Sequence, residues 1–201
     1  HIRVQKSFQN HVDFVGQDQA DIAFMGPAPY IVIRKSYGAK PLLAKLEESE
    51  TPFFHGVIAV RPESPITSLA DLKGKSFAFS DPFSTMGYIV PRAMLAQAGV
   101  PVSQLGKHEF LNSYSDVALA VLGGYFDAGA LKDDIFAEYE KRGLRALARS
   151  EPVPAQLFLA RATLPVQLVE RLRALLYEVN SCPDRQKILT AIRKTATGFA
   201  P

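Results

Sequence analysis

Residues 76–91 carry the feature that most constrains this chain, an apolar strand that runs through a hydroxyl-rich turn into a helix. The segment reads Ser-Phe-Ala-Phe-Ser-Asp-Pro-Phe-Ser-Thr-Met-Gly-Tyr-Ile-Val-Pro. A helix start presents backbone N–H groups that lack partners within the helix, together with the positive end of the helix dipole. Ser84 and Thr85 add two hydroxyl groups there. We therefore predict a seat for a phosphate-like anion at this turn.

Composition narrows the class of protein. The chain has 201 residues, 47% of them hydrophobic, which suffices for one sizeable core or two smaller ones. Its net charge of +3 comes from dispersed basic residues, which disfavours a nucleic-acid surface and fits a weak attraction for small anions. Cys182 is the single cysteine and the four histidines are widely separated, so we expect no disulfide, metal site or cofactor. No apolar run reaches the roughly 18 residues that span a bilayer.

Strand-like and helix-like segments alternate along the chain, which predicts an α/β fold. The expected strands are residues 22–25, 41–46, 53–60, 76–79, 108–111, 126–131, 144–148 and 156–160. The expected helices are residues 28–37, 84–99, 133–141, 164–179 and 184–194, with further helical segments around 8–15, 68–74 and 112–121. Pro91 lies inside 84–99, so we expect that helix to kink or to restart at the proline. Asn112-Ser113-Tyr114 opens a second helix whose start suits an anion.

Two proline-containing polar segments predict a division into lobes. Residues 62–72 and 150–155 have the composition of chain that connects two cores without joining either. We therefore predict a discontinuous first lobe of residues 1–61 and 156–201. Residues 73–149 form the predicted second lobe.

The order of four separated motifs resembles that of the phosphonate/phosphate-type substrate-binding proteins of ABC transporters. The resemblance extends from about Ala20 to Pro201, and a set of spaced motifs is more specific than any one of them. The motifs are Gly26-Pro-Ala-Pro-Tyr30, Ser68-Leu-Ala-Asp-Leu-Lys-Gly-Lys75, Asp81-Pro-Phe-Ser-Thr-Met-Gly-Tyr88 and Phe126-Asp-Ala-Gly129.

The resemblance implies a two-lobed periplasmic-binding-protein fold of type II, with mixed sheets and an oxyanion bound in a cleft between the lobes. It implies a periplasmic or extracytoplasmic location, a phosphonate, phosphate or phosphite ligand, and a membrane permease as partner. It implies no catalytic residues and no nucleic-acid partner, and we expect a monomer. The first strand and helix of the family's amino-terminal lobe are expected before residue 1.

The family's helix-start motif is Ser-Thr-Ser-Gly-Tyr, and this chain matches it from Ser84 to Tyr88 except at Met86. Methionine offers only its backbone N–H there, so one side-chain donor is lost. Our hypothesis is weaker phosphate recognition, or room for a ligand with hydrogen or carbon on phosphorus. Many family members have histidine where this chain has Tyr114, whose phenol still donates one hydrogen bond.

Three further residues have both a binding and a structural interpretation. Tyr30 either contacts the ligand, because it follows the end of a strand, or fills the core beside Pro27. Strand alternation lets His55 face either the cleft or a structural partner. Tyr88 lies one turn after Ser84, where packing beneath the seat is more favoured than contact.

Carboxylates that would hold an amine on the ligand are harder to locate, and Asp127 and Asp133 are the nearest candidates. Lys132-Asp133-Asp134 is most simply interpreted as a solvated helix start.

Two other functions are compatible with the sequence. The same fold serves as the sensor domain of a membrane signalling protein, and sequence beyond Pro201 would distinguish the two. A hydrolase triad of Ser84, His55 and Asp81 is disfavoured because the chain lacks a Gly-x-Ser-x-Gly motif.

Overall fold

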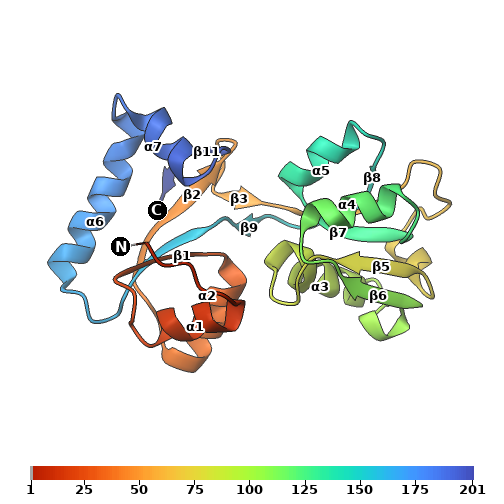
Figure 1. Cartoon of the computed structure of the whole chain (residues 1–201), viewed down its shortest axis with the longest axis horizontal. Helices are drawn as coiled ribbons and strands as arrows, with labels where there is room; N and C mark the ends of the chain where they lie inside the picture. The colour runs from red at the N-terminus through yellow and green to blue at the C-terminus, as the bar shows by residue number, and fades with distance from the viewer. Residues whose placement is uncertain (1) are drawn as a thin grey trace. The chain divides into compact units, whose positions relative to one another are not determined.

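The computed structural model describes residues 2–201, which form two compact units. The first unit comprises the residues up to Phe54 together with Pro154–Pro201, and the second comprises His55–Val153. The chain passes between them twice, and short strands pair at these passages, β3 (Phe53–Phe54) with β9 (Val153–Pro154) (Figure 1).

The first unit is a four-stranded sheet of order β1-β10-β2-β11 in which every neighbouring pair is antiparallel. Alternation along β10 sends Leu157 and Leu159 into the core beneath α1 and α2, while Phe158 and Ala160 face α6 and α7. The elements are α1 (Phe8–Gly16), β1 (Ile22–Met25), α2 (Pro27–Tyr37), β2 (Leu42–Glu48), β10 (Leu157–Ala160), α6 (Val166–Glu178), η4 (Val179–Ser181), α7 (Arg185–Ile192) and β11 (Ala196–Ala200).

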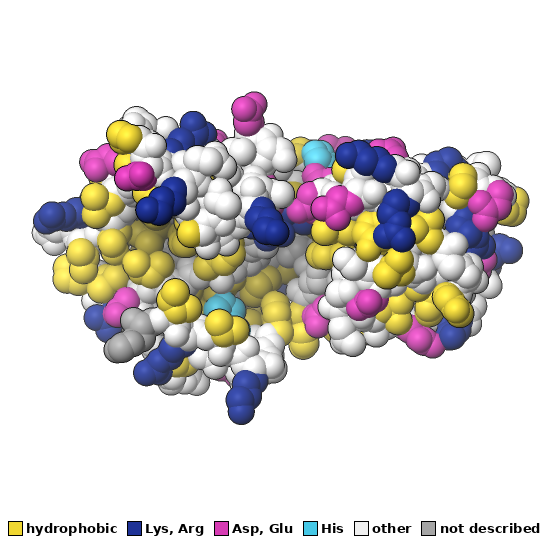
Figure 2. All heavy atoms as spheres, turned by 45° about the horizontal axis from the view of Figure 1, so that its top comes forward, with side chains coloured by type: hydrophobic (Ala, Val, Ile, Leu, Met, Phe, Trp, Pro, Cys, Tyr) yellow, Lys and Arg dark blue, Asp and Glu magenta, His cyan; other side chains and the backbone are white. Residues whose placement is uncertain are grey.

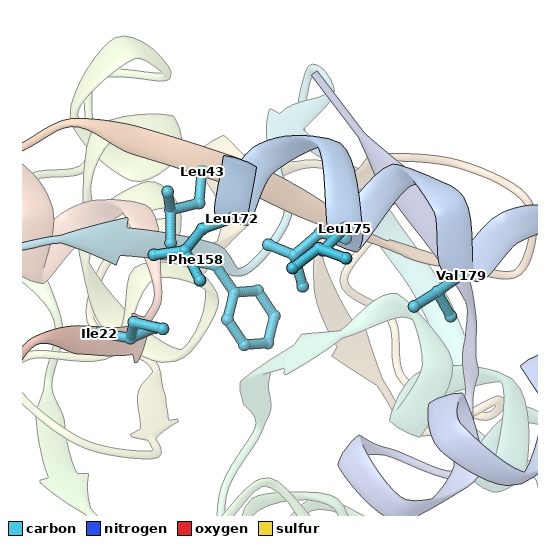
Figure 3. Close-up of a pocket in the computed structure, with 7 residues that line it drawn as sticks. Ile22, Leu43, Phe158, Leu172, Leu175 and Val179 are labelled. Atoms are coloured by element: carbon cyan, nitrogen blue, oxygen red, sulfur yellow. The ribbon is translucent and has the colours of Figure 1, made fainter. Parts of the chain in front are cut away.

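An apolar groove of about 280 Å³ lies between α6 and the sheet of this unit (Figure 3). Its lining residues are Ile22, Leu43, Phe158, Leu172, Leu175, Leu176 and Val179. These side chains carry no hydrogen-bonding groups, so the groove does not suit an oxyanion.

The second unit is a mixed five-stranded sheet of order β6-β5-β7-β4-β8. Strand β5 runs parallel to β6 and β7, and β4 runs antiparallel to β7 and β8. The elements are β4 (Gly56–Val60), η1 (Leu69–Leu72), β5 (Ser76–Phe79), η2 (Thr85–Ile89), α3 (Val90–Gln97), η3 (Val102–Gln104), β6 (Lys107–Phe110), α4 (Tyr114–Leu122), β7 (Ala128–Lys132), α5 (Asp133–Glu140) and β8 (Arg145–Arg149).

Helices cover both faces of this sheet. Leu131 belongs to a buried cluster with Val117 of α4 and Phe136 of α5, on one face. Phe77 and Ala130 belong to a second cluster with Leu95 of α3, on the other face. The site described below forms where β5 ends and the chain turns toward α3.

The predicted α/β class and type II binding-protein fold are confirmed. Strands at 22–25 and 76–79 begin and end where the sequence predicts. The predicted strand 53–60 is instead interrupted at His55, which separates β3 from β4.

The first passage between units comes earlier than the predicted 62–72. Strand β4 pairs with β7 and β8, so it belongs to the second unit, and the proline-containing segment that follows lies inside that unit. The second passage, between Val153 and Pro154, falls within the predicted 150–155.

Among residues 2–201, no helix combines the length and the apolar character that crossing a bilayer requires.

Candidate anion-binding site

A tight turn joins the end of β5 to the predicted anion seat. The Asp81 carboxylate accepts a hydrogen bond from the backbone N–H of Phe83 at 2.8 Å. The backbone carbonyl of Asp81 accepts a second hydrogen bond from Ser84 N at 3.0 Å. Aspartate is favoured in such turns because its side chain substitutes for a backbone acceptor. The turn fixes the point at which the helix begins.

Ser84 caps this helix start. Its Oγ accepts a hydrogen bond from Gly87 N at 2.9 Å, and its carbonyl accepts from Tyr88 N at 3.1 Å and Ile89 N at 3.0 Å. The bond from Ile89 spans five residues, so the first turn, η2, is a π-helical turn. Such a start directs the N–H groups of its first residues away from the helix body.

Pro91 explains how the helix continues after this turn. Proline has no N–H to donate to the Gly87 carbonyl four residues earlier, and that carbonyl instead accepts from Ser80 N at 3.2 Å. The regular helix α3 then begins at Val90 with the proline in its first turn. The expected kink or restart thus takes the form of a change from π-helical to α-helical hydrogen bonding at Val90, one residue before Pro91.

The position of Gly87 has no room for a side chain, because Ser80 lies directly against it. A Cβ atom at this position would overlap Ser80 Oγ and would lie 2.8 Å from Ser80 Cβ. Ser80 is itself buried, with 3% of its surface exposed. The close approach of these two residues holds the π-helical turn against the end of β5.

The residues that precede α4 form hydrogen bonds to the carboxyl-terminal end of β5. Leu111 N donates to Phe79 O at 2.9 Å, and Asn112 N donates to Ser80 O at 2.7 Å. Asn112 adopts a left-handed conformation with φ of 67°, which asparagine tolerates better than most residues. Ser113 then caps α4 by accepting from Asp116 N at 3.0 Å.

The two helix starts meet through their hydroxyl groups. Ser84 Oγ and Tyr114 OH are 2.8 Å apart and share a hydrogen bond. The predicted site residues Ser84, Thr85, Met86 and Tyr114 therefore lie on two adjoining helix starts. Two converging positive helix ends and two hydroxyl groups suit an oxyanion.

Met86 turns its side chain away from the seat into the protein. The residue is 1% exposed, and its Sδ lies 3.0 Å from the point that a Cβ atom on Gly56 would occupy. This position therefore offers the seat only a backbone N–H, as the sequence predicts.

Tyr88 takes the structural role that the sequence favoured. Its ring lies edge-on to Phe79 and Phe110, with ring centres 5.0 Å apart in each case, and the Arg92 guanidinium lies over it at 5.3 Å. The side chain packs beneath the helix start.

His55 also has local structural partners. Its Nδ1 lies 2.9 Å from the Ser150 carbonyl, and its backbone N–H donates to the Asp133 carboxylate at 2.9 Å. Asp133 N in turn donates to the His55 carbonyl at 3.1 Å. These bonds tie the start of α5 to the strand that enters the unit, and they favour the structural interpretation of both residues.

Asp127 lies at the wrong end of the sheet for the predicted role. It precedes β7, whose opposite end is level with the seat, because β5 and β7 are parallel. Its Oδ2 accepts from Ser76 N at 2.9 Å and Ser76 Oγ at 2.8 Å. Burial alone raises the pKa of Asp127, but these hydrogen bonds and the positive charges of Lys75 and Arg61 together lower the pKa overall. The carboxylate fastens two strands together.

The prediction that Lys132 belongs to a solvated helix start is wrong, because the residue is buried. It is the last residue of β7, is only 5% exposed, and pairs through Nζ with Asp134 Oδ2 at 3.1 Å. Sequence reasoning missed it because a Lys-Asp-Asp run before a helix is usually surface. The buried strand before it, Ala128–Leu131, was the available signal.

Tyr30 lies in the first unit, on α2. Its OH donates to the Lys40 carbonyl at 3.3 Å, and its ring packs against the cluster around Ile33 and Leu157. This arrangement supports the core interpretation, and ligand contact stays a prediction.

The hydrolase triad is not assembled in the described residues. Ser84 Oγ pairs with Gly87 and Tyr114, His55 pairs with Ser150, and the Asp81 carboxylate caps its own turn. Each polar group is committed to a different partner.

Comparison with known proteins identifies the family. The family model for the phosphonate periplasmic substrate-binding protein of ABC transporters matches residues 1–201. The chain therefore belongs to this family. The phosphate-import protein PhnD of Mycolicibacterium smegmatis is 28% identical over an alignment of 173 positions, which covers 77% of this chain and 54% of that protein. The chain thus spans about half the length of this curated relative.

Solved structures share the fold. XAC2383 from Xanthomonas citri, bound to ATP, matches all of this chain and 78% of its own with a TM-score of 0.88 and 24% identity. PhnD1 from Prochlorococcus marinus, in complex with methylphosphonate, matches 98% of this chain and 78% of its own with a TM-score of 0.80 and 21% identity.

Proposed function

We propose that this protein captures a small phosphorus oxyanion outside the cytoplasm and delivers it to the membrane permease of an ABC transporter. The observation that carries the proposal is the junction of two helix starts, where Ser84 Oγ and Tyr114 OH meet at 2.8 Å. Family membership supports the transport role. We assign the protein no catalytic step.

The proposed ligand oxygens bind the hydroxyl groups of Ser84, Thr85 and Tyr114 and the backbone N–H of Met86. Hydrogen bonds to a charged group contribute roughly 1.5–3 kcal/mol each. About four of them, less the cost of ordering and desolvation, give micromolar or tighter binding. We propose that Tyr30 of the first unit contributes a further hydroxyl group to the ligand.

The names of the relatives support this ligand class. One imports phosphate, one was solved with methylphosphonate and one with ATP, and all three compounds present oxygens on phosphorus. The loss of a side-chain donor at Met86 favours a ligand with a phosphorus–carbon or phosphorus–hydrogen bond over phosphate.

Isothermal titration calorimetry with phosphate, phosphite, methylphosphonate and 2-aminoethylphosphonate tests the proposal. We expect one binding site per chain for at least one of them, with phosphate weaker than phosphite or methylphosphonate. Absence of binding by all four would refute the function. Equal affinity for phosphate and phosphite would refute the role of Met86 alone.

A further inference from the structure

A buried ammonium group lies at the end of β7. The Lys132 side chain is 6% exposed, and its Nζ is 3.1 Å from the Asp134 carboxylate. Lysine is rarely this buried, since moving its charge out of water is costly. The lysine and arginine side chains on the face drawn in Figure 2 are, by contrast, spread over the surface among acidic and neutral ones.

Strand pairing shows where this side chain extends. Lys132 lies directly opposite Gly56 in the antiparallel ladder between β7 and β4. Residues directly opposite one another point to the same face of a sheet. The Sδ atom of Met86 occupies the space over Gly56, at 3.0 Å from the position of a Cβ atom there. Lys132 therefore lies on the same face of the sheet as the Met86 side chain, which is turned from the seat into the protein.

Because β5 and β7 run in the same direction, Lys132 lies at the same end of the sheet as the turn that follows β5. Strands β5 and β7 are parallel, with Phe77 opposite Ala128 and Ala78 opposite Gly129. Continued along both strands, this register sets Lys132 level with the turn that follows β5. The seat and Lys132 thus lie at the same end of the parallel strands, and the Lys132 side chain leaves β7 on the face of the sheet that α3 covers.

We propose that Lys132 supplies a positively charged hydrogen-bond donor to the ligand, a refinement that rests on the proposed function. In the free protein Asp134 neutralises the ammonium. When a phosphorus oxyanion enters the seat, the ammonium donates to a ligand oxygen while Asp134 keeps it positioned. Amides and hydroxyls contribute only dipoles, whereas a buried ammonium acts as a whole charge in a medium that screens it weakly.

Calorimetry with methylphosphonate on four variants tests this role. Lys132→Met removes the charge with little change in volume, and Lys132→Met with Asp134→Asn also removes the carboxylate left behind. Lys132→Arg keeps the charge. Lys107→Met is the matched control, because Lys107 is also paired with a carboxylate, Glu109 at 2.9 Å, but begins β6, at the end of the parallel strands away from the seat.

We expect Lys132→Met and the double variant each to bind methylphosphonate at least about tenfold more weakly than the unchanged protein, with Lys132→Arg recovering part of the loss. Lys107→Met should bind within about twofold, since an exposed, distant charge is screened. Thermal unfolding of the double variant checks that it is folded.

Wild-type affinity in the folded double variant, or an equal loss in Lys107→Met, would overturn the role of Lys132. Failure of the unchanged protein to bind any of the four ligands named above would instead overturn the proposed function, and this inference with it.

Discussion

The replacement Ser84→Ala separates a ligand-binding hydroxyl from an ordinary helix cap. Ser84 Oγ accepts from Gly87 N at 2.9 Å and pairs with Tyr114 OH at 2.8 Å. Ser113 provides a matched cap, since its Oγ accepts from Asp116 N at 3.0 Å and donates to the Asp116 carboxylate at 2.6 Å. The two serines make the same capping bond, but only Ser84 joins the two helix starts.

Loss of either cap should cost about 1 kcal/mol of unfolding free energy, because one helix-start N–H loses its acceptor. In a chain of this size that corresponds to a fall of about 2–4 °C in Tm. Ser84→Ala also removes one hydrogen bond to the proposed anion, worth roughly 1.5–3 kcal/mol, or about a 10- to 150-fold rise in Kd. Ser113→Ala should leave Kd within about twofold of the unchanged protein.

Differential scanning calorimetry and isothermal titration calorimetry with methylphosphonate measure the two effects on the same samples. Similar falls in Tm with divergent Kd values are the expected result. Equal losses of affinity in both variants would mean that loosening a helix start, rather than removing a ligand contact, weakens binding. Unchanged affinity in Ser84→Ala would remove Ser84 from the site.

Three further predictions concern the framework of the two units. Folding lowers the pKa of Asp127, so its carboxylate contributes stability above its ordinary value of 3.8 and loses that contribution as pH falls below it; Asp127→Asn should flatten the acid limb of a urea-unfolding profile, and an unchanged slope would contradict this. Lys40 is buried and donates to the Asp18 carboxylate at 2.6 Å, so Lys40→Met should cost about 3 kcal/mol in urea unfolding, with partial recovery when Asp18→Asn is added. Gly87→Ala should cost about 1–3 kcal/mol through overlap with Ser80 and should weaken methylphosphonate binding at least about tenfold; addition of Ser80→Gly should restore both, and failure to do so would show that the overlap is not the cause.

Local sequence patterns predicted the parts of the fold that depend on local physics. The apolar run of β5, the turn at Asp81 and the change of helix type beside Pro91 follow from residue preferences within a few positions, and each is present in the structure. The cap at Ser84 belongs to the same class.

Features that depend on strand pairing were missed. Residues 56–60 were predicted to belong to the first lobe, but β4 pairs with β7 and β8 in the second unit. Asp127 precedes β7 and Lys132 is its last residue, so strand direction places Asp127 at the end of the sheet away from the seat and Lys132 at the end level with it. A single sequence read in segments does not contain strand order, so it could not distinguish them.

The most direct test of the anion seat is a titration followed by backbone amide NMR. Methylphosphonate added to the protein labelled with nitrogen-15 should shift the amide signals of Thr85, Met86 and Tyr114 in a saturable way, because hydrogen bonds to an anion deshield the donor proton. The amides of Ser76 and Asp127, at the opposite end of the sheet, should stay unchanged. Saturable binding in which the Thr85 and Met86 signals do not move would contradict the account.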